Sequence, residues 1–326
     1  MSVTNMVVYD QEIRLRTIEL LGQDLQKFNA GSGGAIVLDM SRWTGNYTKE
    51  SFFNSVASAQ RRVNRFAANG AQASTALSES EMVGVKVAGG FGPIVFEPSQ
   101  LTWLSDDPET AINVIAQGFA DALLADQLNT VVGCAVAAIE NIPALVNDVS
   151  ALTAGAGALT QSVLNGSHAK FGDRSGMLMA DVMTGAAFHK LVEKGLDNGE
   201  RLFMSSNVTV QSILGKIFVV SDIPALAVAG TPNKTYVVSF VAGGAVVDNA
   251  SDIITNLDPS NGKERIETTW QADYSFGVKL KGYAWDIANG GASPDDADLF
   301  TGSNWDNVMG DVKHTAGTLA IADIDQ

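Results

Sequence analysis

Apolar residues near the N-terminus recur at the spacing of an amphipathic helix. They lie in residues 11–28, after Asp10, while charged residues occupy the other faces. The apolar positions are Ile18, Leu21, Leu25 and Phe28. The helix is predicted to end in the run 29–34, because glycine loses much conformational freedom in a helix. The same run is a candidate hinge, with Gly31, Gly33 and Gly34 as its residues.

A second helical pattern follows a short predicted strand at residues 35–38. Thr48 precedes apolar residues at helical spacing and suits a helix N-cap. The apolar residues are Phe52, Val56, Ala59, Val63 and Phe66. The end of this predicted helix carries three arginines, Arg61, Arg62 and Arg65. We expect them to face the negative helix C-terminus or an acidic neighbouring subunit; a phosphate site is the alternative, disfavoured by the negative charge of the chain.

Residues 69–96 have the alternation of an extended hairpin, with Val83, Val85 and Val87 separated by smaller or polar residues. The run 89–93, Gly-Gly-Phe-Gly-Pro, is predicted to form a turn between strands. It is not predicted to bind phosphate, because it lacks the G-x-G-x-x-G spacing and a helix directly behind it.

The clearest predicted element is a long helix from Pro108 to about Glu140. Proline suits the first helical position, and Pro143 marks the end. At 1.5 Å per residue this helix would be about 50 Å long and would span the molecule. Its apolar residues are Ile112, Ile115, Phe119, Leu123, Leu124, Leu128, Val131 and Val132.

The remaining chain mixes predicted helices and strands without a βαβ rhythm, which indicates an α+β fold. A connector at 147–157 precedes these elements. The predicted helices are 159–171 and 184–194, and the predicted strands are 177–183, 216–221, 235–241, 265–270 and 274–285.

Composition excludes several classes of protein. The 326 residues carry a net charge of −15, with 46% hydrophobic and 17% charged residues, which excludes a strongly basic nucleic-acid-binding protein and a disordered chain. The single cysteine, Cys134, excludes a disulfide framework and a thiolate zinc cluster, and is predicted to be a core residue. The sequence shows no secretory signal, and its longest apolar runs fall short of the roughly 20 residues that cross a bilayer. A soluble protein made in a cytoplasm is expected.

Motifs for catalysis or metal binding are missing from the sequence. It contains no G-x-S-x-G, H-E-x-x-H or phosphate-loop motif, and His168, His189 and His314 stand far apart. The acidic run 293–298 lacks the pattern of a calcium loop and is predicted to be a solvated turn. We therefore predict no catalytic residue, no metal site and no cofactor.

Three strings in this order resemble the major capsid proteins of tailed bacteriophages that have the Hong Kong ninety-seven capsid fold. They are 178–191 (LMADVMTGAAFHKL), 214–222 (LGKIFVVSD) and 276–285 (FGVKLKGYAW). The resemblance covers about residues 10–319. It implies an α+β subunit with an N-terminal arm (1–34), an extended loop (35–104), a spine helix of the peripheral domain (105–142), an axial domain (143–261) and further peripheral strands with the C-terminus (262–326).

This resemblance implies a structural protein that assembles as pentamers and hexamers into an icosahedral head around double-stranded DNA. The expected partners are other copies of the chain, the portal, scaffolding and decoration proteins, and DNA held only non-specifically, with no membrane. The expected location is the virion, after assembly in the bacterial cytoplasm. The candidate intersubunit contacts are Arg14, Arg16, Arg61, Arg62, Arg65 and Lys86. In some members a loop lysine forms an isopeptide crosslink, but no motif around Lys86 assigns that chemistry to it.

Three alternatives stay open at the level of sequence. A bacterial nanocompartment shell shares the same fold but encloses an enzyme. A surface-layer protein suits the acidic, cysteine-poor composition, although the sequence shows no export signal. A soluble enzyme would need a site assembled from residues that lie far apart in the chain.

Overall fold

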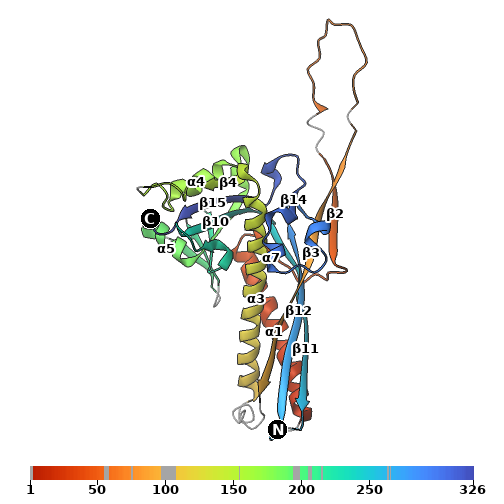
Figure 1. Ribbon diagram of the computed structural model, residues 1–326, viewed down its shortest axis with the longest axis vertical. Helices are drawn as coiled ribbons and strands as arrows, with labels where there is room; N and C mark the ends of the chain where they lie inside the picture. The colour runs from red at the N-terminus through yellow and green to blue at the C-terminus, as the bar shows by residue number, and fades with distance from the viewer. Residues whose placement is uncertain are drawn as a thin grey trace.

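The computed structural model describes residues 3–54, 59–74, 76–96, 108–153, 155–193, 199–204, 208–213, 216–262, 264 and 266–326. The molecule is elongated, with a long central helix that separates two sheets and a hairpin that projects beyond the body (Figure 1). The boundary between the predicted extended loop and spine helix, at 104 and 105, lies outside the described residues.

Two helices form the long axis of the molecule. Helix α3 (Pro108–Glu140) has the bounds predicted from its two prolines, and α1 (Val3–Gly31) lies alongside it. The core between them includes Leu21, Leu25 and Leu123, all at most 2% exposed. Residues 113–140 of α3 are apolar enough to cross a membrane by composition, but 78% of that apolar stretch is buried inside the fold, as in the core helix of a globular protein.

Helix α1 begins earlier than the sequence predicted. Asp10 lies inside the helix instead of preceding it. Its two carboxylate oxygens accept hydrogen bonds of 2.9 Å from Trp270 Nε1 and Thr255 Oγ1, so it ties the helix to the neighbouring sheet. The helix ends inside the predicted glycine-rich run, and Gly33 and Gly34 follow with φ of 64° and 73°.

The first sheet runs beside these helices. Its strand order is β1–β11–β12–β3–β2 in the described part of the chain. The strands are β1 (Ile36–Leu38), β2 (Tyr47–Phe53), β3 (Glu79–Phe96), β11 (Ala245–Ser260) and β12 (Glu267–Leu280). Among the described strands of this sheet, only the β1–β11 pair is parallel. The sequence predicted two strands, 265–270 and 274–285, where the structure has one continuous strand, β12, from Glu267 to Leu280.

The predicted helix after Thr48 is wrong. Residues 47–53 form β2, which pairs in antiparallel fashion with residues 79–85 of β3. Val56 lies outside the described residues, and Phe66 is 93% exposed in a segment without helical structure. The apolar spacing matched a helix, but the partner strand β3 satisfies the backbone of this segment in extended form.

The predicted turn at 89–93 is also wrong, because β3 runs straight through it to Phe96. The ring of Tyr274 on β12 lies over Gly89, where a Cβ atom would come within 2.4 Å of the ring. Gly92 has a φ of 95° at a point where the pairing register with β12 shifts. These glycines therefore permit close packing within a strand rather than a reversal.

The second sheet lies on the other side of α3. Its strand order is β4–β15–β10–β5–β8–β7–β6, with β9 beside β10, in the described residues. The strands are β4 (Val146–Asp148), β5 (Leu178–Met183), β6 (Gly199–Met204), β7 (Val208–Ile213), β8 (Lys216–Ser221), β9 (Ala227–Val228), β10 (Lys234–Val241) and β15 (Gly317–Asp323). Helices α4 (Gln161–Ala169) and α5 (Gly185–Glu193) pack nearby, close to their predicted positions.

A smaller unit after β12 completes the fold. It contains β13 (Tyr283–Trp285), α6 (Ile287–Gly290), α7 (Asp296–Leu299) and β14 (Trp305–Asn307). Short 3-10 helices lie at Pro143–Leu145, Gly172–Met177, Pro224–Leu226, Gly302–Asn304 and Val312–His314. The predicted solvated turn at 293–298 overlaps helix α7, whose N-terminus is capped by Asp295 and Asp298 in a capping box. In the core of this smaller unit, the rings of Trp285 and Trp305 pack edge to face, with 4.9 Å between their centroids.

The two sheets cross the domain boundaries expected from the sequence. Strand β11 falls in the range expected for the axial domain, but it pairs with β1 and β12 of the first sheet. Strand β15 falls in the range expected for the peripheral strands, but it pairs with β10 and β4 of the second sheet. Each sheet is therefore assembled from segments that lie far apart in the sequence.

Candidate assembly surfaces

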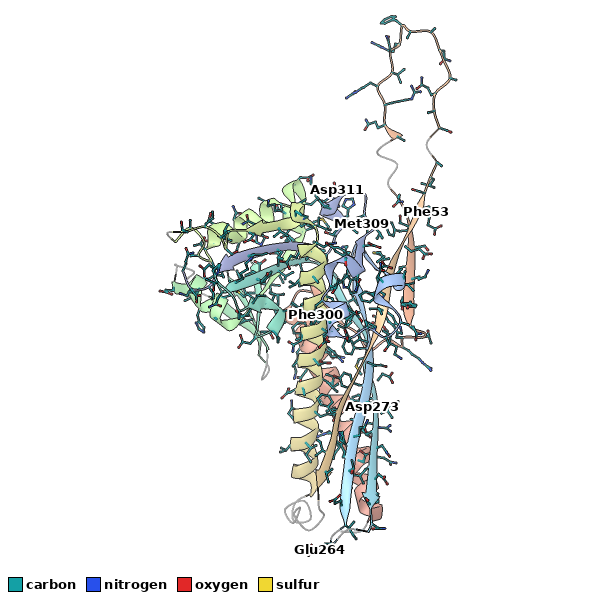
Figure 2. All side chains as sticks on the ribbon, in the orientation of Figure 1. Phe53, Glu264, Asp273, Phe300, Met309 and Asp311 are labelled. Atoms are coloured by element: carbon teal, nitrogen blue, oxygen red, sulfur yellow. The ribbon has the colours of Figure 1, made fainter. Side chains whose placement is uncertain are left out.

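The hairpin tip, residues 59–74, projects far from the body (Figure 2). Arg61, Arg62 and Arg65 are exposed there, and the guanidinium of Arg65 lies 6.0 Å from the ring centroid of Phe66. The exposed apolar residues on the hairpin are Phe53, Val63, Phe66 and Leu77. The arginines are therefore not at a helix C-terminus; they lie exposed on the same segment as Val63 and Phe66.

The lower part of the first sheet has an acidic face that points away from the helices. Side chains of β11 and β12 alternate, so that Ile253 and Tyr274 are buried toward the helices while their neighbours face outward. We name this outward surface the stem face and define it by Asp252, Ile254, Asp258 and Asp273. Ile254 is 65% exposed and pairs directly with Asp273. Sequence reasoning missed this surface, although alternation along residues 252–258 was available as a signal.

The other predicted contact residues lie on the body. Arg16 donates from Nε to Asn113 Oδ1 at 3.1 Å and pairs with Glu19 at 2.8 Å, so it links α1 to α3 within one subunit. Arg14 is half-buried on α1. Lys86 is half-buried on β3, where it pairs with Gly277 of β12. The structure therefore does not bring Arg14, Arg16 and Lys86 to the hairpin tip.

The candidate hinge is held by several hydrogen bonds. Asn29 accepts from the backbone of Leu38 at 2.9 Å and donates to its carbonyl at 2.8 Å. The carbonyl of Gly34 accepts from Gly243 N at 2.7 Å. A Cβ at Gly33 would lie 2.9 Å from Ile217, whereas a Cβ at Gly34 would meet open space. Bending at this run would therefore require these hydrogen bonds to break.

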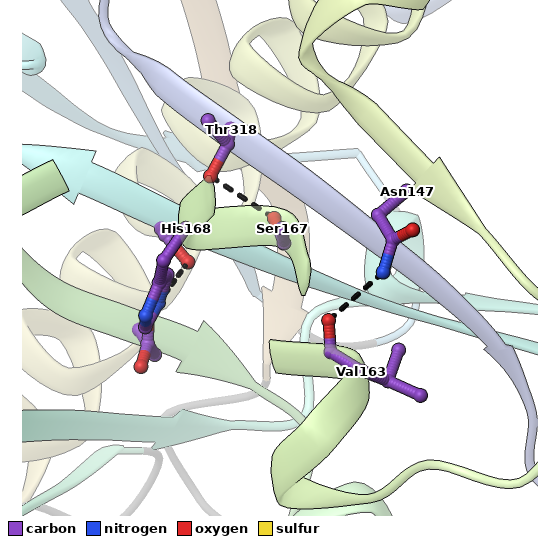
Figure 3. A network of polar contacts seen from close by, with 7 residues as sticks. Asn147, Val163, Ser167, His168 and Thr318 are labelled. Carbon is purple, nitrogen blue, oxygen red and sulfur yellow. Dashed lines mark hydrogen bonds and ion pairs between the residues drawn. The ribbon is translucent and has the colours of Figure 1, made fainter. Parts of the chain in front are cut away.

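A buried polar network crosses the second sheet (Figure 3). His168 Nε2 lies 2.9 Å from Asp181 Oδ1 and 3.1 Å from Ser239 Oγ. The residue types match a Ser-His-Asp triad, but both partners meet the same ring nitrogen, whereas catalysis needs them on opposite nitrogens. Ser239 is fully buried, so no substrate reaches it. Ser167 Oγ donates to Thr318 Oγ1 at 3.0 Å beside it, and the network joins α4 to three strands.

A second polar contact joins the helix α3 to the first sheet. Tyr274 Oη donates to Asp126 Oδ2 at 2.6 Å. Burial raises the pKa of Asp126; the hydrogen bond from Tyr274 acts against this shift, and the nearby charge of Asp296 adds to it. Burial also raises the pKa of Tyr274, with further contributions from Asp126. The pair is a structural link between α3 and β12.

The described part of the chain contains no candidate metal site, because no group of three or more His, Cys, Asp or Glu side chains comes together there. Cys134 is a free thiol and fully buried, as predicted for a core residue. Burial raises the pKa of this thiol. The exposed surfaces at the hairpin tip and the stem face are therefore the features that remain for function.

Comparisons with known proteins agree with this arrangement. The model of the family described as major capsid protein 13-like matches residues 5–319. Comparison with curated protein sequences gives no match. The capsid asymmetric unit of cyanophage Pam1 is similar in structure, with a TM-score of 0.52, 11% identity and 89% of each chain covered. A structure from Microbacterium phage Oxtober96 gives a TM-score of 0.47 at 9% identity, covering 89% of this chain and 90% of that one.

The family match spans nearly the whole chain, and the Pam1 match shows the shared fold. The expected α+β capsid fold of the Hong Kong ninety-seven type is confirmed, as is a structural rather than enzymatic role. The chain belongs to the major capsid protein 13-like family and is a bacteriophage major capsid protein of the virion.

Proposed function

We propose that this chain assembles as pentamers and hexamers into an icosahedral head around double-stranded DNA, with the hairpin tip docked on the stem face of a neighbouring copy. The observation that carries the proposal is a basic tip, with Arg61, Arg62 and Arg65 exposed, on a chain of net charge −15. All residues of the tip, 59–74, are exposed in the isolated subunit. Complementary charge steers such surfaces together and sets their register.

The apolar residues of both surfaces support the same contact. Val63 and Phe66 are 66% and 93% exposed on the tip, and Ile254 is 65% exposed on the stem face. Their burial between subunits would be favourable by about 25 cal/mol per Å² of apolar area. In a closed symmetric shell each such contact is repeated by every subunit, so a weak contact gains strength from its multiplicity.

The parts of the subunit follow from this role. Helix α1 forms the arm, the β2–β3 hairpin the extended loop and α3 the spine; the first sheet belongs to the peripheral domain and the second sheet to the axial domain. The glycine-rich run with Gly31, Gly33 and Gly34 acts as a hinge of the arm during expansion of the shell. Arg14, Arg16 and Lys86 contact neighbouring subunits from the body.

Further partners complete the proposal. Assembly takes place in the bacterial cytoplasm with a portal, scaffolding and decoration proteins. The packaged DNA is held only non-specifically, because a negatively charged wall does not bind phosphate.

The test compares shells from two matched triple variants. One carries Arg61→Glu, Arg62→Glu and Arg65→Glu; the control carries Arg42→Glu, Lys170→Glu and Arg174→Glu, three exposed residues that give the same change of charge. Sedimentation and electron microscopy measure the yield of closed shells. We expect closed shells from the wild type and the control, and soluble capsomers or subunits from the tip variant. Equal yields from all three would refute docking by the tip.

A further inference from the structure

Strand β3 changes its partner at one position. Its residues 85–96 pair with β12, and its residues 79–85 pair with β2, so both pairings meet at Val85. Beyond this point the base of the hairpin still contacts the body through side chains such as Met82, whose Sδ accepts a hydrogen bond from Gly282 N at 3.3 Å. The angle of the hairpin therefore depends on the contacts made at and just beyond the changeover.

Lys279 of β12 makes such contacts on both sides of the changeover. Its Nζ atom lies 2.5 Å from Asp248 Oδ2 on β11 and 3.1 Å from Glu50 Oε1 on β2. A single ammonium group thus connects the body of the sheet to the edge strand of the hairpin. The side chains of Lys279 and Asp248 are only 24% and 11% exposed, so solvent screens their interaction less than it screens a surface pair.

The path of this side chain is built by two glycines and one tryptophan. A Cβ atom on Gly84 would lie 2.6 Å from Lys279 Cγ, so only glycine lets the lysine stem cross β3 here. The ring of Trp43 lies against Gly277 and Gly84, and Lys279 Nζ is 5.6 Å from its centroid. An ammonium over an aromatic face is attracted to the ring.

We propose that Lys279 is an ionic strap that sets the angle at which the hairpin leaves the body, and that loss of its bond to Glu50 frees the hairpin to swing. The consequence for the shell rests on the proposed docking of the tip, since a fixed angle presents the tip to its neighbour in one orientation. The strap itself lies within one subunit, so it can be tested without assembly of the shell.

The neighbouring ion pair shows the difference between a strap and an ordinary pair. Lys49 and Glu81 lie 2.9 Å apart, but they join β2 to β3 within the hairpin and do not reach the body. Burial lowers the pKa of Lys279, but its hydrogen bonds and charge interactions with Asp248 and Glu50 outweigh burial and raise it. The ammonium therefore stays charged at neutral pH.

The experiment measures the hairpin angle in the full-length, unassembled subunit. Spin labels are attached at Ser51→Cys on β2 and Ser303→Cys on the body, both exposed, while the native Cys134 is buried and does not react. Pulsed electron–electron double resonance spectroscopy gives the distribution of distances between the two labels. The variant is Glu50→Gln, which keeps the Lys279–Asp248 bond, and the matched control is Glu81→Gln, which breaks only the pair within the hairpin.

We expect one narrow distance population in the wild type and in Glu81→Gln. In Glu50→Gln a displaced population should rise about fivefold, equivalent to about 1 kcal/mol. High salt should produce the same rise in the wild type. Identical distributions for Glu50→Gln and Glu81→Gln would overturn the strap, whatever the shell yield of the arginine variants, and a displaced population with normal shells would overturn only the docking of the tip.

Discussion

Replacement of Gly277 by alanine should destabilise the subunit strongly, although alanine normally suits a strand better than glycine. A Cβ atom at this position would come within 2.1 Å of Trp43 Cε3 and 2.2 Å of Cζ3. The ring has little room to shift, because Trp43 Nε1 donates to Gly45 O at 2.9 Å and Lys279 lies over the ring. The tryptophan must therefore leave its site, where it is only 6% exposed.

The size of the effect follows from the area that Trp43 would expose. An aromatic side chain buries roughly 150–250 Å², which at about 25 cal/mol per Å² corresponds to roughly 4–6 kcal/mol as an upper bound. Mutations that truncate buried aromatic residues cost about 3–5 kcal/mol. We expect Gly277→Ala to lower the free energy of unfolding by about 3–5 kcal/mol, close to the effect of Trp43→Ala.

The assay is urea unfolding of the unassembled subunit, followed by far-UV circular dichroism. The matched control is Gly118→Ala on the exposed side of α3, where a Cβ atom meets nothing within 4 Å. It should gain about 0.5–1 kcal/mol, because alanine favours a helix over glycine. In the double variant with Trp43→Ala, Gly277→Ala should cost almost nothing more. A stable Gly277→Ala subunit, or additive losses in the double variant, would refute the reasoning.

Two further predictions concern α3 and the arm. The stability of Asp126→Asn relative to the wild type should increase as pH rises from 3.8 through the folded-state pKa of Asp126. Burial raises this pKa, so the wild type loses stability over that interval, whereas asparagine does not titrate. Urea unfolding at several pH values measures this, and a stability difference that does not change with pH would contradict it. Gly34→Ala should cost about 1 kcal/mol through its φ of 73°, and Gly33→Ala more, because its Cβ atom would also press on Ile217. Thermal unfolding ranks the two, and equal losses would contradict the ranking.

Local signals in the sequence determined the elements that depend only on their own residues. The prolines at 108 and 143 enclose α3, and the helix has the predicted bounds. Cys134 is buried inside an apolar stretch of that helix, as its surroundings predicted. Three strands of the second sheet, β5, β8 and β10, were predicted, because β-branched runs such as 216–221 favour extended backbone. Strands β6, β7 and β15 of the same sheet were not predicted from the sequence. The three strings that resemble phage capsid proteins led to the family.

Tertiary structure decided the features that depend on a distant partner. The apolar spacing after Thr48 fits a helix, but β3 supplies the backbone partners that make residues 47–53 a strand. Gly89 lies inside a strand because it pairs with β12, and the ring of Tyr274, far along the chain, occupies the space that a side chain would take. The three arginines of the hairpin tip were identified from the sequence, but their exposure and the acidic stem face depend on the sheet. Local patterns do not decide these features, because a helix is closed by hydrogen bonds four residues apart, whereas each strand pairing joins segments that only the folded chain brings together.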